Sequence, residues 1–147
     1  MRIAGATKKY NRSEHLVYAC QYHVIFCPKY RRGVLTDAIE IRLQEIFNQV
    51  KDKYQFEILE MEIRPDHVHL IIDVNPRFGI MECVRKLKGA SARTLRKEFP
   101  ALKSRLPSLW TRSAFISSVG AITLGVVKRY LENQKNKWAE AKPHHSS

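Results

Sequence analysis

Two strand-like stretches lie so close together in this sequence that they can only pair with one another. Residues 56–63 and 67–74 are rich in apolar and β-branched side chains, and only Arg64, Pro65 and Asp66 separate them. Parallel strands need a long crossover connection, so a link of three residues predicts an antiparallel hairpin. Every other element of the chain has to be arranged around this hairpin.

Strand-like and helix-like stretches flank the hairpin in alternation. Aromatic and β-branched stretches predict strands, and apolar side chains at three- and four-residue spacing predict helices, the first of them capped by Asp37. The order βαββαβα predicts an α+β fold of the ferredoxin-like or RRM-like kind: a four-stranded antiparallel sheet with two helices on one face. An extra C-terminal helix is free to lie against the other face. The expected elements are strands at residues 17–27, 56–63, 67–74 and 110–119, helices at 37–54, 80–95 and 121–138, and a loop containing Pro100 and Pro107.

Length and charge limit the class of protein. The 147 residues fit one domain spanning 1–147, with a core at 14–137 and flexible tails at 1–13 and 139–147. Lys and Arg number 26 against 14 Asp and Glu, and the formal net charge of +12 predicts a polyanionic partner. No apolar run reaches the ~18–20 residues that span a bilayer, and no secretory signal is visible. We therefore expect a cytoplasmic protein that binds nucleic acid rather than a membrane. The three cysteines, Cys20, Cys27 and Cys83, lack metal-ligand spacing and are expected to be small buried residues.

A histidine pair in the third expected strand is the first candidate for chemistry. In His67-Val68-His69 the side chains alternate, so the two histidines share one face about 6.6–6.8 Å apart while Val68 points into the opposite layer. Two imidazoles at that separation can share one metal ion, and Asp66 can orient one of the rings. Taken alone, the pair fits two histidines on a solvated sheet face equally well.

The last expected helix adds a second candidate group. Tyr130 and Gln134 stand four residues apart and face the same way, with about 5–6 Å between their Cβ atoms. Tyr130 offers a phenolic oxygen, and the Gln134 amide oxygen can complete a set of two nitrogens and one oxygen around a metal. Separately, Tyr130 fits an amphipathic core position and Gln134 a solvated one. Only the combination with the histidines is informative.

Four stretches together resemble a known family. They are YHVIFCPKYRR at residues 22–32, PDHVHL at 65–70, KLKGAS at 86–91 and YLENQ at 130–134, and they occur in that order. Over residues 14–137 the chain resembles the TnpA-type, single-tyrosine HUH transposases of single-strand insertion sequences, the IS200-like transposase family. The REP-associated tyrosine transposases are close relatives.

The resemblance implies a reaction and a set of roles. Tyr130 is the nucleophile that attacks a DNA phosphodiester, keeps the 5′-phosphate as a phosphotyrosine and releases a 3′-OH. A divalent metal, Mg²⁺ or Mn²⁺, is held by His67, His69 and Gln134, with Asp66 behind the ligands. The substrate is single-stranded DNA with a hairpin near each end of the element. The enzyme is a homodimer whose active sites can be composite between subunits. The family more often has polar residues around Leu124 and Gly125, and this departure concerns the flexibility of the last helix, which Gly120 precedes.

Basic residues in two of these stretches are expected to contact DNA phosphates. Singly, each of them also fits a solvated surface position. The candidates are Lys29, Arg31, Arg32, Arg85, Lys86, Lys88 and Arg93.

Four alternatives remain beside this interpretation. A non-catalytic RRM-like module needs exposed aromatic residues on its central strands, whereas HVHLIIDV at residues 67–74 has none. A two-histidine phosphoesterase needs a second His-x-Ser or His-x-Thr motif, and a zinc-binding structural domain needs cysteines at ligand spacing. A domesticated REP-associated transposase that processes dispersed palindromes shares the same chemistry. Matching imperfect palindromes flanking the gene would indicate a mobile element instead.

Overall fold

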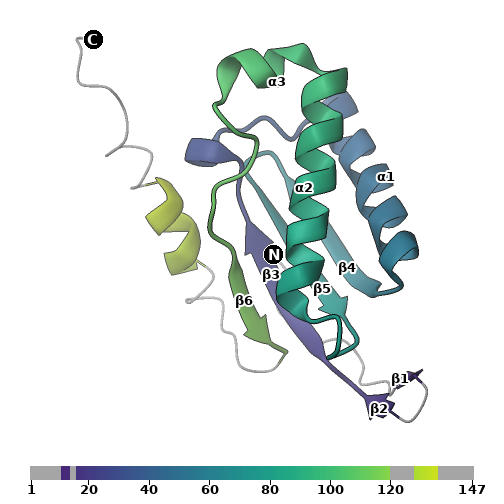
Figure 1. Cartoon of the computed structure of the whole chain (residues 1–147). Helices are drawn as coiled ribbons and strands as arrows, with labels where there is room; N and C mark the ends of the chain where they lie inside the picture. Colours follow the sequence, from purple (N-terminus) through teal and green to yellow (C-terminus); the bar gives the residue numbers. More distant parts are fainter. Residues whose placement is uncertain (1–10, 14–15, 120–127, 136–147) are drawn as a thin grey trace.

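A four-stranded antiparallel sheet forms the centre of the molecule (Figure 1). The computed structural model describes residues 11–13, 16–119 and 128–135. Strands β4 (Glu57–Arg64) and β5 (His67–Asp73) are the predicted hairpin. β3 (Gln21–Phe26) pairs with the other side of β5, and β6 (Phe115–Ser118) completes the order β4-β5-β3-β6. The predicted α+β fold is confirmed, and β3 and β5 are the central strands.

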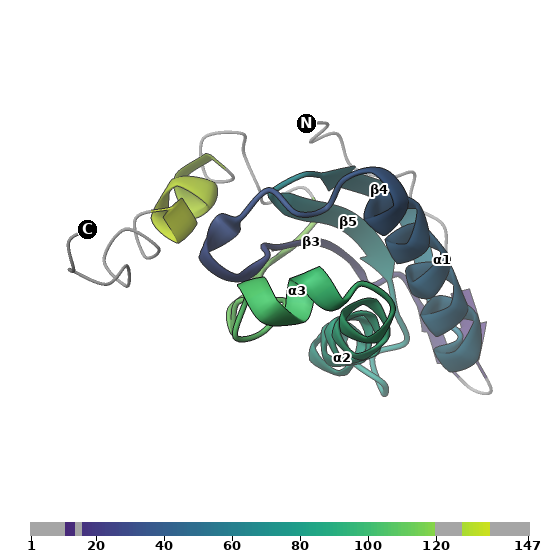
Figure 2. The same ribbon diagram turned by 90° about the horizontal axis from the view of Figure 1, so that it is seen from above.

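Two long helices cover one face of this sheet, as Figure 2 shows. They are α1 (Asp37–Tyr54) and α2 (Ile80–Glu98), and the short α3 (Pro100–Arg105) follows α2. Alternation along the central strands sends every second side chain into the layer between sheet and helices. The core includes Val24, Phe26, Leu43, Phe47, Val68, Leu70, Ile72 and Leu87, all of them fully buried.

The opposite face of the sheet carries the described part of the last helix. Residues 128–135 are helical, and Leu131 packs with Ile25 and Cys27, which point away from the main core. In Figures 1 and 2 this segment, drawn in yellow, lies on the other side of the sheet from α1 and α2. The expected extra helix on the second face is therefore present over these residues. Its expected ends, with Gly120, Leu124 and Gly125, lie outside the described residues.

The expected first strand is divided in two. β2 (Leu16–Tyr18) pairs with β1 (Asn11–Ser13) in a separate two-stranded sheet, and β3 begins only at Gln21. The last pair between β3 and β5 joins Gln21 to Asp73, so the chain before Gln21 has run past the end of the main sheet. The prediction of one strand at 17–27 was wrong, and residues 11–13, expected in a tail, form a strand.

The expected fourth strand is shorter than predicted, and part of the expected loop before it is helical. Residues 110–114 lie outside β6 because some of their backbone carbonyls bond to a side chain instead of a strand. Lys88 donates to the carbonyl oxygens of Thr111 and Ser113 at 2.6 and 3.1 Å. Trp110 makes one isolated bridge to Pro28, and its indole N–H donates to Ser91 Oγ at 2.9 Å. Pro100 begins α3, since proline suits the first position of a helix.

The start of α1 also differs in detail. Thr36 occupies the N-cap position, and no side-chain hydrogen bond caps the helix. Asp37 is the first helical residue, with a φ of 53°. The prediction that Asp37 caps this helix was wrong, although the helix spans the expected residues.

Candidate active site

Strand β5 presents His67 and His69 on the face of the sheet that α1 and α2 do not cover. Val68, between them, lies in the main core, so the two imidazoles point the other way. Neither ring lies on an open, solvated face, since His67 is 8% exposed and His69 3%. The pair therefore forms a sheltered polar site inside an otherwise apolar sheet.

One ring nitrogen of His67 is hydrogen-bonded to a carboxylate, and the other has no partner among the described residues. Its Nδ1 lies 2.9 Å from Asp66 Oδ1, as expected for a carboxylate that orients the ring. Its Nε2 is buried and has no hydrogen-bond partner among the described residues. Burial alone would raise the pKa of Asp66, but the hydrogen bond with His67 and the charge of Arg31 outweigh it and hold the pKa below its ordinary value. A histidine with one nitrogen on a carboxylate and the other free is arranged as metal-binding histidines are.

His69 is held by a third histidine that the sequence interpretation did not include. His23, from β3, stacks on it with ring centroids 5.3 Å apart, and His23 Nδ1 lies 3.1 Å from His69 Nε2. Burial, together with the neighbouring His23, lowers the pKa of His69 to about 4. His69 is therefore neutral at pH 7, which is the form that binds metals. Alternation along residues 21–26 puts His23 on this face, but only the pairing of β3 with β5 brings it to His69.

The helix at residues 128–135 brings Tyr130 and Gln134 to the same face. The Tyr130 ring packs on Phe115 with centroids 5.5 Å apart, and Gln134 is 4% exposed. The Tyr130 hydroxyl lies 3.4 Å from Ser113 Oγ, and burial raises its pKa to about 12. Within the described part of the chain neither Tyr130 nor Gln134 hydrogen-bonds to His67 or His69. The tyrosine is protonated and packed here, so it needs help to act as a nucleophile.

The short turn η1 (Lys29–Arg31) connects this helix with the histidine site. Arg31 Nε forms an ion pair with Asp66 Oδ2 at 2.8 Å, and Arg31 Nη1 donates to the backbone carbonyl of Leu131 at 2.8 Å. Tyr30 and Arg31 have φ angles of 60° and 53°. Non-glycine residues in this left-handed region carry strain of about 1–3 kcal/mol each and occur mostly where the surroundings enforce them.

Two kinds of site are absent from the described residues. No group of three or more His, Cys, Asp or Glu side chains is arranged there to hold a metal. A site built from His67, His69 and the Gln134 amide would have only two ligands of those types. In the same part of the chain, no helix has the length and apolarity that a bilayer crossing requires.

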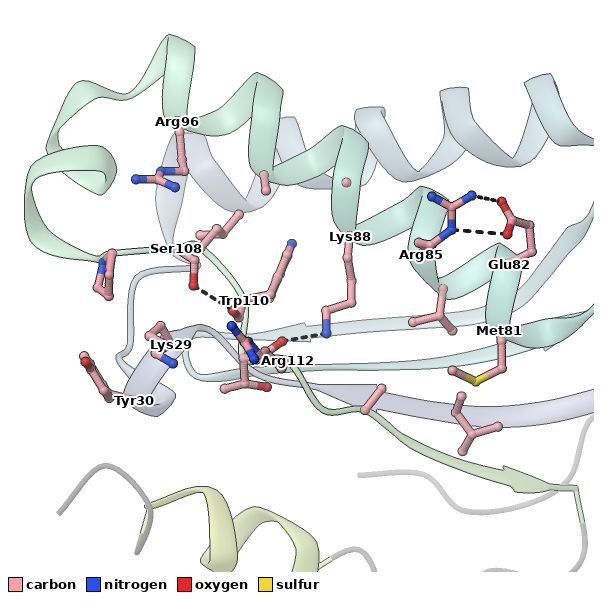
Figure 3. A pocket seen from close by; sticks show the side chains of 18 residues that line it. Lys29, Tyr30, Met81, Glu82, Arg85, Lys88, Arg96, Ser108, Trp110 and Arg112 are labelled. Atoms are coloured by element: carbon pink, nitrogen blue, oxygen red, sulfur yellow. Dashed lines mark hydrogen bonds and ion pairs between the residues drawn. The ribbon is translucent and has the colours of Figure 1, made fainter. Parts of the chain in front are cut away.

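A cationic cavity of about 950 Å³ lies between α2 and the segment that follows α3 (Figure 3). Three of the expected DNA contacts, Lys29, Arg85 and Lys88, line it. Arg96 and Arg112 line it as well; neither is among the expected contacts, because charge alone does not tell which lysines and arginines gather in one cavity. Trp110 and Tyr30 add aromatic faces to its wall.

The residues expected to contact DNA differ in whether their charged groups already bond to other protein groups. Lys88 crosses from α2 to two backbone carbonyls, and burial lowers its pKa. Arg85 is ion-paired with Glu82, which also lies 3.7 Å from Lys86 Nζ. Arg93 is exposed on α2 beside a second basic hollow. Arg32 is half-buried next to η1, and Arg31 points to Asp66 rather than to the cavity.

Comparison with known sequences points to one kind of enzyme. A family model described as transposase IS200 like matches residues 16–134. The chain is 37% identical over 123 residues to the ISDra2 transposase TnpA of Deinococcus radiodurans, covering 82% of this chain and 88% of that protein. It is 29% identical over 126 residues to the transposase for insertion sequence element IS200 of Salmonella typhimurium, covering 82% and 83%.

Solved structures give the same result for the fold. A 1.90 Å crystal structure of a protein from Deinococcus radiodurans R1, described as a transposase, superposes with a TM-score of 0.77 at 34% identity, covering 84% of this chain and 97% of that one. A REP-associated tyrosine transposase bound to a REP hairpin superposes with a TM-score of 0.53 at 18% identity, covering 86% and 76%. At that identity the second likeness concerns the fold alone.

Proposed function

Because this chain belongs to the IS200-like transposase family, and is thus a DNA strand transferase, we propose that it cuts and rejoins single-stranded DNA through a covalent link to Tyr130. The observation that carries this proposal is the arrangement around β5. His67 keeps a buried, open Nε2, its other nitrogen is fixed by Asp66, and the Tyr130 helix packs on the same face of the sheet.

The proposed reaction exchanges one phosphodiester for another. The Tyr130 oxygen attacks the scissile phosphorus, the 3′-oxygen of the neighbouring nucleotide leaves, and the 5′-phosphate stays on Tyr130. A 3′-OH later attacks the phosphotyrosine, which reseals DNA and returns the proton to Tyr130. The number of phosphoester bonds does not change, so no ATP is required. Because burial raises the pKa of Tyr130 to about 12, the phenol must lose its proton during the attack, and the leaving 3′-oxygen gains one proton to become the 3′-OH.

We propose that His67, His69 and Gln134 hold the divalent metal, Mg²⁺ or Mn²⁺, that assists this step. The open nitrogen of His67 and the neutral ring of His69 fit such a role. Binding there requires His69 either to give up its contact with His23 at Nε2 or to use Nδ1, which lies 3.8 Å from Glu62. When bound, the metal would polarise the scissile phosphate and stabilise charge on the leaving oxygen.

The cationic cavity of Figure 3 supplies a surface for the DNA backbone. We propose that single-stranded DNA with an adjacent hairpin binds there. Lys29 and Tyr30 line this cavity while the next residue, Arg31, reaches Asp66 at the histidine site. The turn η1 therefore lies between the proposed DNA surface and the proposed catalytic groups. An insertion-sequence end is favoured over dispersed palindromes because the insertion-sequence transposases are 37% and 29% identical to this chain, whereas the REP-associated transposase is 18% identical.

Replacing Tyr130 tests the proposal directly. Tyr130→Phe keeps the ring that packs on Phe115 and removes only the hydroxyl, so hairpin binding should persist while cleavage and the covalent adduct disappear. Denaturing gels with end-labelled single-stranded DNA measure both. Tyr54→Phe is the matched control, because Tyr54 stacks on Phe78 and packs against the main core on the side of the sheet away from the histidines, and it should leave the adduct unchanged. An adduct that survives in Tyr130→Phe would move the nucleophile elsewhere and overturn the proposal.

A further inference from the structure

Arg31 contacts both the histidine site and the helix that carries Tyr130, and its hydrogen bond to Leu131 joins residues 100 apart in sequence. One edge of its guanidinium forms the ion pair with Asp66, the carboxylate that holds His67. The other edge donates to the backbone carbonyl of Leu131, which directly follows Tyr130. We propose that Arg31 is a positioning residue that fixes the Tyr130 helix relative to the histidine site. This inference rests on the function proposed for Tyr130 and His67.

The geometry of Arg31 suits this role better than that of a simple surface charge. Its side chain is only 13% exposed. A guanidinium is planar and carries donors in a fixed fork, so it can engage a carboxylate and a carbonyl at once in a defined orientation. Arg31 Nη1 donates a hydrogen bond to Leu131, and Nε contacts Asp66 as an ion pair. Both contacts come from one rigid planar group, which a lysine ammonium does not have.

The backbone conformation around Arg31 directs its side chain toward Asp66 and Leu131. Tyr30 and Arg31 are consecutive non-glycine residues in the left-handed region. The turn is held by Lys29 N–H donating to Leu109 and by Arg31 N–H donating to Pro28, both at 2.8 Å. Strained conformations persist only where the surroundings enforce them, and they gather at functional positions. Here one of the two strained residues, Arg31, contacts both halves of the proposed site.

Over its described residues, 128–135, the helix that carries Tyr130 has few apolar contacts, so the Arg31 contact matters for its position. Leu131 packs with Ile25 and Cys27, and Tyr130 and Phe115 lie against that small cluster. The main core, by contrast, joins more than twenty buried residues. In the described part of the chain the Arg31–Leu131 bond is the one polar contact between this helix and η1. Loss of Arg31 should therefore release the helix without unfolding the core.

The three cysteines report this release without any DNA. Cys27 is fully buried beneath Leu131, Cys83 is fully buried in the main core, and Cys20 is partly exposed. Alkylation of each thiol, resolved by peptide mass spectrometry on the full chain, distinguishes helix release from unfolding. In Arg31→Met the Cys27 rate should rise about ten-fold or more, the effect of losing a hydrogen bond to a charged group, while Cys83 stays unreactive.

Two further variants control this measurement. Arg105→Met removes the same charge from an exposed position on α3 and should leave all three thiols as in the unchanged protein. Arg31→Lys keeps the charge but not the fork, so its Cys27 rate should fall between those of the unchanged protein and Arg31→Met. Equal rates in Arg31→Met and the unchanged protein would overturn the inference. A parallel rise at Cys27 and Cys83 would overturn it too, because Arg31 would then stabilise the whole fold.

Adduct formation separates positioning from DNA contact. If Arg31 positions Tyr130, Arg31→Met lowers the single-turnover rate of adduct formation about ten-fold and leaves hairpin affinity and its salt dependence within about two-fold of the unchanged protein. If Arg31 contacts a phosphate, affinity and salt slope fall and Cys27 stays protected, which overturns the inference. Absence of a Tyr130-dependent adduct in the unchanged protein would instead refute the proposed function. The alkylation result, which needs no DNA, would still decide whether Arg31 docks the helix.

Discussion

His67 and His69 differ in their surroundings although they lie two residues apart on β5. His67 is held from outside by the carboxylate of Asp66, whereas His69 is stacked between strands against His23. Alternation along the strand was enough to predict that both histidines share one face and that Asp66 reaches one of them. The His23 contact depends on the register of β3 against β5, which links residues 46 apart and leaves no local pattern in the sequence.

This difference predicts unequal effects of two similar substitutions. His67→Ala and His69→Ala should each abolish cleavage and weaken Mn²⁺ binding, measured by calorimetry. His67→Ala should leave stability nearly unchanged, because Asp66 keeps Arg31 as its partner. His69→Ala leaves His23 buried without its partner and should lower the free energy of unfolding in urea by about 1–3 kcal/mol. Full Mn²⁺ binding in either variant would show that the pair is structural.

At the level of elements, one half-buried cation, Lys88, explains why β6 is short. Lys88 lies over the Phe26 ring and binds the carbonyls of Thr111 and Ser113, so the strand ladder is interrupted between Phe115 and the isolated bridge at Trp110. Aromatic and β-branched stretches predicted the four strands of the main sheet, and apolar periodicity predicted α1 and α2. The short α3 lies in the segment that was expected to be a loop. The strand ends were not predictable from the sequence, since they depend on side chains from distant elements.

The same contact predicts a stabilising role for Lys88 that a surface lysine would not have. Lys88→Met removes the donor to both carbonyls and should lower the free energy of unfolding by about 1–3 kcal/mol, since two partly buried acceptors lose a charged partner. Urea titration followed by circular dichroism measures this. Lys97→Met, at an exposed position on the same helix, is the matched control and should change little. Equal stabilities of the two variants would mean that Lys88 binds those carbonyls too weakly to define the end of β6.

At the scale of the whole molecule, the helix that carries Tyr130 packs on the outer face of the sheet and takes no part in the main core. Its described contacts are made to β3, to the first residue of β6, to the chain just before β6 and to η1. None of them belongs to the core between the sheet and α1 and α2. A partner subunit would present the same surface, with its own Cys27 and Arg31. The helix of one chain can therefore serve the histidines of another if the protein is the dimer that the family resemblance implies.

Subunit mixing tests this exchange. Tyr130→Phe lacks the nucleophile, and His67→Ala lacks a proposed ligand while keeping its fold, so neither should cleave single-stranded DNA alone. If the tyrosine helix acts on the partner's histidines, a heterodimer contains one site with both defects and one intact site, and the mixture regains cleavage up to about half the activity per dimer of the unchanged protein. If each chain builds its own site, both sites in the heterodimer remain defective. Mass spectrometry under native conditions verifies that heterodimers have formed. A verified heterodimer that does not cleave would show that Tyr130 acts only with the histidines of its own chain. The contacts of Leu131 with Cys27 and Arg31 within one chain would then also describe the state that cleaves DNA.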